Sequence, residues 1–344
     1  MDTANAERVA PPHAAARTSE GVDGRELVVE RVVDAPRAMV FRAFTEGDHV
    51  AHWFGPFGFR TTTHDRTVAA DGRWRFTMHG PDGTDYPNVV RYREVRPGER
   101  LWYRHSSSEE SDDGFDVVIT FTDEGRGTRV TLRQTHPTAE RAAEIATYAL
   151  EGGRQTMARL DGYLSVLREQ WPDAVLEGAT HAVDDDLVLL RALDGPSERV
   201  FRAITEPADL ARWFGPGGAG VRVVESSLRA GGRLRYAMKA GEHEAFGRFV
   251  YRDVEVPRRL AYVVSFTDER GEPIRHPASA TWPLEVLSLV TLTPHGQRTL
   301  LAMRSLPIHA NDVERATFRA GHDGMRQGFA KPYAQLDELL RTKR

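Results

Sequence analysis

The string VFRAFTE at residues 40–46, followed by HWFGP at residues 52–56, organises the rest of the chain, because the chain contains it twice. The second occurrence reads VFRAITE at residues 200–206 and RWFGP at residues 212–216. DAP at 34–36 likewise returns as DGP at 194–196, and GRWRFTM at 72–78 returns as GRLRYAM at 232–238. All of these blocks share one offset, since 194 − 34, 213 − 53 and 232 − 72 each equal 160. Solenoid units are only about 20–50 residues long, so this period indicates a duplicated domain.

The length of 344 residues is sufficient for two domains of ordinary size, each with its own hydrophobic core. We expect a disordered tail at residues 1–24, a first domain at 25–168, a linker at 169–186 and a second domain at 187–344. Thr128 corresponds to Thr299, where the offset has grown to 299 − 128 = 171, so the second copy is longer. We place the additional residues in a loop at 268–283, which is rich in proline.

Composition excludes several classes of function. The net charge is −4 and both signs are interspersed, so nothing favours binding to nucleic acid or to an anionic membrane surface. The chain has no cysteine, which excludes disulfides, thiol nucleophiles and cysteine metal sites. It also has no signal peptide and no apolar run near the ~20 residues of a membrane helix, so we expect a cytoplasmic protein.

The local pattern of the first copy predicts strands and helices in a definite order. An alternating strand at 27–33 is followed by a helix that Asp34 caps and Pro36 begins, and by a short helix at 47–54 that Gly55 and Pro56 end. Apolar residues at steps of three and four predict a long helix at 138–168. Between these helices lie six predicted strands, with turns short enough for an antiparallel meander, at 59–65, 73–79, 89–95, 100–105, 115–122 and 128–135.

The second copy repeats this order, with a strand at 187–193, helices at 197–205 and 208–214, and strands up to residue 305. We expect a last helix at 311–341, kinked or broken at Pro332 because proline lacks the backbone N–H. A sheet and a helix that each have one apolar side bury those sides against each other. The sequence therefore predicts an α+β fold in which each copy wraps a curved antiparallel sheet around a long C-terminal helix, with two short helices.

Several motifs in this order carry a family resemblance. In the first copy they are Ala35-Pro36, Val40-Phe41, WFGP at 53–56, Gly72, the segment 94–101 and the helix residues 153–164; in the second they are Gly195-Pro196, Val200-Phe201, WFGP at 213–216, Gly232, the segment 253–260 and residues from Gly324 onward. The chain resembles tandem START-like (SRPBCC, helix-grip) proteins, and within them the family named for its homology to the heat-shock protein ATPase activator. The resemblance implies a cavity between sheet and helix. Such proteins include lipid and hormone binders, polyketide aromatase/cyclases, antibiotic-sequestering proteins and co-chaperones.

Strand alternation predicts which side chains line the two cavities. Trp74, Phe76 and Met78 share one face of the strand at 73–79, while Arg73, Arg75, Thr77 and His79 share the other. The predicted ligand-binding set is aromatic and methionine-rich, and comprises Trp53, Trp74, Phe76, Met78, Tyr103, His105, Phe121, Met157, Trp213, Phe214, Tyr236, Met238, Phe249, Tyr251 and Tyr262. Large aromatic walls suit a flat polycyclic ligand. The alternative, that these residues form filled cores, stays open.

Candidate catalytic and metal-binding residues are few. His105, near Tyr103, is the best general acid or base because the pKa of histidine lies near neutrality. Its counterpart in the second copy is Val264, so a hydrogen-bonded wall residue is the alternative interpretation. His49 and His52 are replaced by Asp209 and Arg212, and no third ligand is indicated, so we expect no metal site and no cofactor.

These features favour non-enzymatic binding of a hydrophobic, polycyclic aromatic small molecule, as in a polyketide carrier or in antibiotic self-resistance by sequestration. One alternative is a polyketide aromatase/cyclase that acts on a poly-β-ketone, with Tyr103 or His105 moving protons. A third hypothesis is a chaperone ATPase cofactor, which rests on the family resemblance. The sequence identifies no protein partner.

Overall fold

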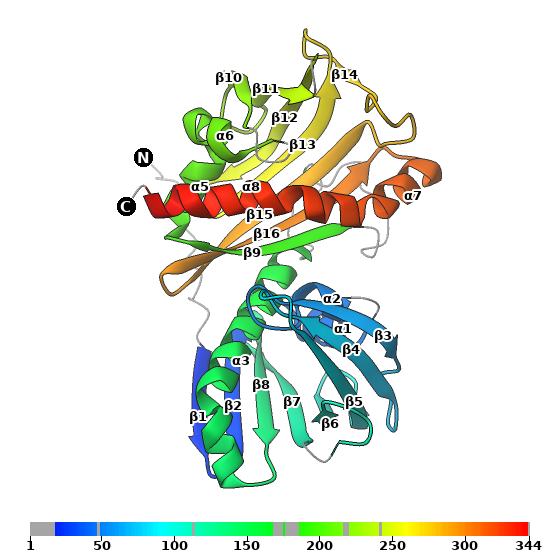
Figure 1. The fold of residues 1–344 in the computed structure, drawn as a ribbon, viewed down its shortest axis with the longest axis vertical. Coiled ribbons are helices and arrows are strands. Elements are labelled where there is room, and N and C mark those ends of the chain that lie inside the picture. The colour runs from blue at the N-terminus through cyan, green and yellow to red at the C-terminus, as the bar shows by residue number, and fades with distance from the viewer. Residues whose placement is uncertain are drawn as a thin grey trace, which may run out of the picture.

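The computed structural model describes residues 18–46, 49–111, 114–167, 175, 186–215, 220–240 and 243–342. It contains two domains in tandem, each with an antiparallel sheet and a long C-terminal helix (Figure 1). The predicted α+β class and the tandem helix-grip architecture are confirmed. Residues 1–17 of the expected tail and most of the expected linker lie outside the described residues.

The first domain follows the predicted order closely. Its strand order in the sheet is β1-β2-β8-β7-β6-β5-β4-β3, with every neighbouring pair antiparallel. The elements are β1 (Thr18–Asp23), β2 (Glu26–Val33), α1 (Arg37–Thr45), α2 (His49–Trp53), β3 (Arg60–Arg66), β4 (Arg73–His79), β5 (Asp85–Arg96), β6 (Arg100–Ser106), β7 (Phe115–Glu124), β8 (Gly127–Thr135) and α3 (Ala139–Leu167).

Two details of the first domain differ from the prediction. Strand β1 forms within the expected tail, where it pairs with β2 along its whole length. Asp34 does not cap α1: Pro36 holds the N-cap position, without a side-chain hydrogen bond, and the Asp34 carboxylate instead lies 3.8 Å from Arg126. Proline reaches the extended N-cap conformation without strain because its ring already restricts φ to the range that this position requires.

The second domain repeats the architecture with one insertion. Its sheet has the order β10-β11-β12-β13-β15-β16-β9, and β14 lies in the inserted segment and pairs with β13. The elements are β9 (Leu187–Asp194), α5 (Ser197–Thr205), α6 (Pro207–Trp213), β10 (Arg222–Ser226), β11 (Arg233–Ala240), β12 (His243–Glu255), β13 (Arg259–Thr267), β14 (Pro273–Ile274), β15 (Glu285–His295), β16 (Arg298–Ile308), α7 (Asp312–Ala320) and α8 (His322–Thr342).

The prediction was a kink or a break of the last helix at Pro332, and no break occurs there. The interruption lies at Gly321, between α7 and α8, and α8 continues through Pro332 (Figure 1). Pro332, Tyr333 and Leu336 are all buried, so the packing of α8 on the sheet outweighs the backbone hydrogen bond that proline cannot make. A capping box of Asn311 and Glu314 begins α7.

Helix α3 belongs to the cores of both domains. It packs against β2 of its own sheet and against β15 and β16 of the second sheet, and its residues 156–164 are all buried. A Cβ on Gly162 would lie 2.5 Å from Leu300 Cδ2, so glycine allows β16 to approach the helix this closely. The Ser165 and Thr291 hydroxyls lie 2.7 Å apart across the same contact. Figure 1 shows α3 extending from the first sheet to the second.

Candidate functional site

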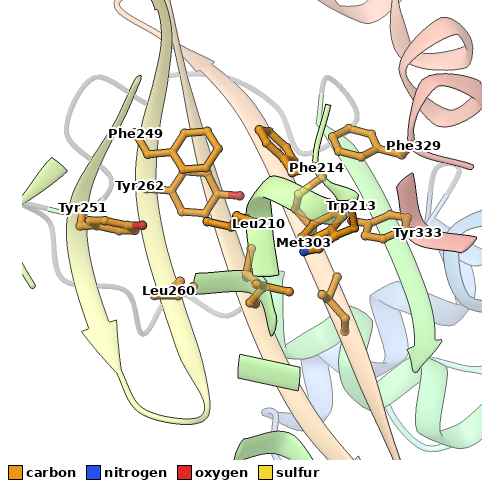
Figure 2. A pocket seen from close by; sticks show the side chains of 13 residues that line it. Leu210, Trp213, Phe214, Phe249, Tyr251, Leu260, Tyr262, Met303, Phe329 and Tyr333 are labelled. Carbon is orange, nitrogen blue, oxygen red and sulfur yellow. The ribbon is translucent and has the colours of Figure 1, made fainter. Parts of the chain in front are cut away.

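The second domain encloses a cavity between its sheet and helices α6 and α8 (Figure 2). Its volume is ≈ 50 Å³. The lining is apolar and aromatic, and consists of Ile204, Leu210, Trp213, Phe214, Phe249, Tyr251, Leu260, Tyr262, Val290, Leu301, Met303, Phe329 and Tyr333.

Strands β12 and β13 supply one aromatic wall. Tyr251 lies opposite Tyr262 in the antiparallel register, and Phe249 lies on the same face of β12 as Tyr251. The Phe249 and Tyr262 rings are 4.5 Å apart between centroids and tilted by 33°, and the Tyr251 and Tyr262 rings are 6.2 Å apart, edge to face. The wall is thus held by ring contacts within the sheet.

The repeated Trp-Phe-Gly-Pro segment positions the opposite wall. Trp213 Nε1 donates to the Ala203 carbonyl (2.8 Å) and its ring stacks on Tyr333 (6.3 Å between centroids, 17°). These contacts tie α6 to α5 and α8, and they leave Phe214 at the cavity. Gly215 has φ +132°, and a Cβ there would lie 2.7 Å from the Gly220 carbonyl oxygen, so the turn requires glycine.

Helix α8 closes the cavity with two stacked rings. Phe329 and Tyr333 are four residues apart and therefore lie on one face of the helix, with ring centroids 5.5 Å apart. Phe329 and Phe214 are only partly buried, whereas Tyr333 and Trp213 are buried. Ile204 and Tyr262 are also partly buried, so the partly exposed part of the lining includes residues of α5 and β13 as well as Phe214 and Phe329 (Figure 2).

The cavity wall is polar only at a few points. All the lining side chains are uncharged at neutral pH, and the hydroxyl groups come from Tyr251, Tyr262 and Tyr333. Burial raises the pKa of all three tyrosines, that of Tyr251 to about 12. At neutral pH these hydroxyls are therefore neutral hydrogen-bonding groups rather than acids or bases.

Five residues of the predicted set line this cavity: Trp213, Phe214, Phe249, Tyr251 and Tyr262. Tyr236 packs behind them, 5.4 Å from the Phe214 ring and 5.3 Å from the Phe249 ring, and Met238 packs against the same core. The prediction omitted the contribution of α8. The four-residue spacing of Phe329 and Tyr333 was the signal for it, since that spacing places both rings on the face turned toward the sheet.

In the first domain the corresponding predicted residues lie in a packed interior. Trp74 and Phe76 stack with centroids 3.8 Å apart, and Phe54 meets both rings edge to face. Trp53 and Met157 are fully buried, Met78 is partly buried against the same core, and Phe121 packs against Phe44 (5.2 Å). Trp53 repeats the hydrogen bond of Trp213, donating to the Ala43 carbonyl at 3.1 Å.

Tyr103 and His105, the candidate catalytic pair, lie on adjacent inward positions of β6. Burial, and secondarily Tyr92, raises the pKa of Tyr103. His105 Nε2 lies 2.8 Å from Asn88 Oδ1, and its ring is 5.0 Å from that of Phe115. His105 thus has a hydrogen-bonding partner on β5 and a ring contact on β7.

The two histidines of α2 surround Tyr163 of α3. His49 Nδ1 is in hydrogen-bonding contact with the Tyr163 hydroxyl, and His52 stacks on the Tyr163 ring (5.6 Å, 16°). Burial, and secondarily Arg326 of α8, lowers the pKa of His52 to about 3. Within the described residues, no group of three or more His, Cys, Asp or Glu side chains could hold a metal ion, and no helix is long and apolar enough to cross a membrane.

Comparison with known proteins identifies a family match in both copies. The family model described as "Activator of Hsp90 ATPase homolog 1-like protein" matches residues 34–165 and 194–341. No curated protein matches. The chain is similar to the solved structure of protein NE0264 from Nitrosomonas europaea, with 23% identity over 42% of this chain and 98% of that one (TM-score 0.39).

Two further similar structures span both copies. DynU16, from the dynemicin biosynthetic locus, is 18% identical over 92% of this chain and 99% of its own (TM-score 0.33). The di-domain ARO/CYC BexL from the BE-7585A biosynthetic pathway is 14% identical over 91% of this chain and 98% of its own (TM-score 0.36).

Proposed function

The chain belongs to the family of Activator of Hsp90 ATPase homolog 1-like proteins, and from the cavity of its second domain we propose that it binds a neutral, hydrophobic aromatic small molecule without altering it chemically. The observation that carries this proposal is the lining, which is uncharged and rich in rings. The ligand is a polycyclic compound such as an aromatic polyketide, which the protein carries or sequesters.

Ring geometry supports an aromatic ligand. The rings of β12 and β13 stand across the cavity from Phe214, Phe329 and Tyr333 (Figure 2). A flat ligand between these walls stacks in the offset and edge-to-face arrangements that aromatic pairs favour, each worth about 0.5–1.5 kcal/mol beyond the area buried. The tyrosine hydroxyls orient a carbonyl or phenol group of the ligand by hydrogen bonds.

The cavity must expand when such a ligand binds. Its ≈ 50 Å³ compare with about 300–1,000 Å³ for pockets that enclose drug-sized ligands. Four lining side chains are only partly buried: Ile204, Tyr262, Phe214 and Phe329. The last two are rings that lie outside the strands. We therefore propose that they act as the gate.

The chemistry of the lining supports binding rather than catalysis. General acid or base catalysis is most efficient when the pKa of the group lies near the working pH. The ionisable groups in this lining are tyrosines whose pKa burial has raised further. The first domain, with its packed interior, acts in this proposal as the structural partner that supplies α3.

Retention of a ligand from an extract tests the proposal. The purified full chain is incubated with an extract of its source organism, separated from unbound material, and analysed by mass spectrometry. We expect an unchanged aromatic compound to be retained, and Phe329→Ala, which removes one ring of the gate, to shorten its residence time. Recovery of a compound that has lost water or closed a ring would instead support the cyclase alternative. Retention of nothing would contradict the proposal.

A further inference from the structure

A second cavity of ≈ 380 Å³ lies between the two domains. The first domain contributes the segment 57–59, Pro81 and Arg159; the second contributes residues 190–192 of β9, Arg298 and Leu300 of β16, and Asp337 of α8. Strand β9 is the edge of the second sheet and lies on the side of that sheet nearest the first domain (Figure 1). Neither domain forms this cavity alone.

One wall of the cavity contains a buried cation. Arg159 is only 8% exposed. Its Nη1 donates to the carbonyls of Gly55, Pro56 and Phe59, each at 2.9 Å, and Nη2 donates to that of His52 at 3.2 Å. No carboxylate of the described residues forms an ion pair with it, and burial lowers the pKa of its guanidinium to about 10, so it is charged at neutral pH. Buried charges are ordinarily paired with an opposite charge.

The second domain adds two more guanidinium groups. Arg191 pairs with Asp337 at 2.5 Å. Arg298 pairs with Asp194 at 3.1 Å and lies over the Phe57 ring, 5.4 Å from its centroid. Three arginines thus lie around the cavity, and two of them, Arg191 and Arg298, are paired with carboxylates. The third, Arg159, leaves one positive charge in excess.

The same region lowers the pKa of a neighbouring histidine. His295, whose ring meets that of Phe57 edge to face at 5.1 Å, has its pKa lowered by burial first, and then by Arg31, Arg154 and Arg298. A cation is therefore disfavoured beside the cavity. Phe57, Phe59 and Leu300 make part of the lining apolar. The cavity therefore suits a ligand that has an apolar group as well as a charge.

We propose that the cavity between the domains binds a small organic monocarboxylate. Its carboxylate compensates the excess charge of Arg159 and accepts hydrogen bonds from Arg298, because a planar guanidinium matches the two oxygens of a carboxylate. Its apolar part lies against Phe57 and Leu300. This site is separate from the cavity of the second domain and does not depend on the function proposed for that cavity.

Binding at this site couples the two domains. The ligand contacts both domains at the same time: segment 57–59 of the first and strand β9 of the second. It therefore binds only when the domains have their native arrangement. A ligand that binds only the native state stabilises it in proportion to the logarithm of its concentration.

Calorimetric titration of the full chain with benzoate tests the proposal. At low ionic strength, where charge interactions are least screened, we expect benzoate to bind at one site and the neutral analogue benzyl alcohol to bind at least tenfold more weakly. Arg298→Gln removes one charged donor and is expected to weaken benzoate binding about tenfold or more. Ala192→Phe fills the cavity without a change of charge and is expected to abolish binding. The matched control is Arg233→Gln on β11, outside this cavity, which leaves binding unchanged.

Four results would overturn the proposal. They are no benzoate binding to the wild type, equal binding of benzyl alcohol, binding of inorganic phosphate in preference to benzoate, and undiminished benzoate binding to both Arg298→Gln and Ala192→Phe. Circular dichroism of each variant verifies that it is folded. If one of the two variants does not fold, the other still decides where benzoate binds.

Discussion

Exchange of one residue between the two copies should abolish ligand binding. Ile204 lines the cavity of the second domain, and Phe44 holds the same place in the first copy, as the alignment of VFRAITE with VFRAFTE shows. The Phe44 ring meets Trp53 at 4.7 Å and Phe121 at 5.2 Å, both edge to face, and so fills the first interior. Ile204→Phe is therefore expected to fill the second interior in the same way.

The structure gives the size of this effect. An empty apolar cavity costs about 24 cal/mol per Å³, so ≈ 50 Å³ costs about 1.2 kcal/mol. Overpacking by a larger side chain costs about 1–3 kcal/mol, which offsets that gain, so we expect the free energy of unfolding of Ile204→Phe to stay within about 1.5 kcal/mol of the wild type. The affinity for the retained ligand is expected to fall by more than tenfold, because the added ring occupies its space.

The reverse exchange is the matched control. Phe44→Ile removes two edge-to-face contacts worth about 0.5–1.5 kcal/mol each and is expected to lower the free energy of unfolding by about 1–3 kcal/mol, with the ligand affinity unchanged. Urea denaturation measures stability and equilibrium titration measures affinity. Unaltered affinity in Ile204→Phe, or lost affinity in a folded Phe44→Ile, would refute the assignment of the ligand to the cavity of the second domain.

Three other predictions concern single side chains. Tyr251→Phe is expected to weaken ligand binding about two- to tenfold by loss of one hydrogen bond, whereas Tyr92→Phe in the first copy leaves the affinity measured by titration unchanged. Arg159→Met leaves four carbonyls without their donor and is expected to lower the free energy of unfolding in urea by about 3 kcal/mol. The exposed Arg202→Met is expected to lower it by less than about 0.5 kcal/mol, and a loss below about 1 kcal/mol in Arg159→Met would contradict the prediction. Because the pKa of His52 is lowered from 6.5 to about 3 in the folded state, its contribution to stability is complete above pH 6.5 and decreases progressively as the pH falls toward 3. We expect the wild type to lose about 2 kcal/mol more than His52→Gln between pH 7.5 and 5, and parallel pH profiles of the two proteins would contradict this.

The sequence predicted the elements and the tandem fold because those depend on local signals. The repeated motifs, the Gly55-Pro56 stop and the short turns each specify their own part of the chain. The position of the helix break could not be obtained in this way. Pro332 is a strong local signal, but its effect is overridden by the burial of Tyr333 and Leu336, which is a tertiary property.

The candidate cavity was predicted only in part, for a related reason. Strand alternation identifies which side chains face inward, and it placed Phe249, Tyr251 and Tyr262 correctly on that face. It does not say whether the inward space is filled. That depends on the summed volume of side chains from several elements, such as Phe44 of α1 in one copy and Ile204 of α5 in the other.

The packing between the domains did have a signal in the sequence. In the first sheet, buried and less buried residues alternate along VVITF at 117–121, as expected for a sheet with one covered face. The strings VLSLVTL at 286–292 and TLLAM at 299–303 are nearly continuous apolar runs, and almost all of their residues are buried. A continuous run indicates a strand covered on both faces. Here the second covering is α3 of the first domain, together with Val175.

The two copies therefore have different physical roles in one structure. The first has a packed interior, and its helix α3 covers the outer face of β15 and β16, whose inner face holds Val290, Leu301 and Met303 of the cavity. Support from behind keeps that wall rigid, because a strand packed on both faces cannot move away from the cavity without opening a second void. In the proposed function, expansion for a ligand is then expected on the opposite side, which includes the partly buried Phe214 and Phe329. On this proposal the duplication accounts for both a fixed wall and a movable one around the cavity of the second domain.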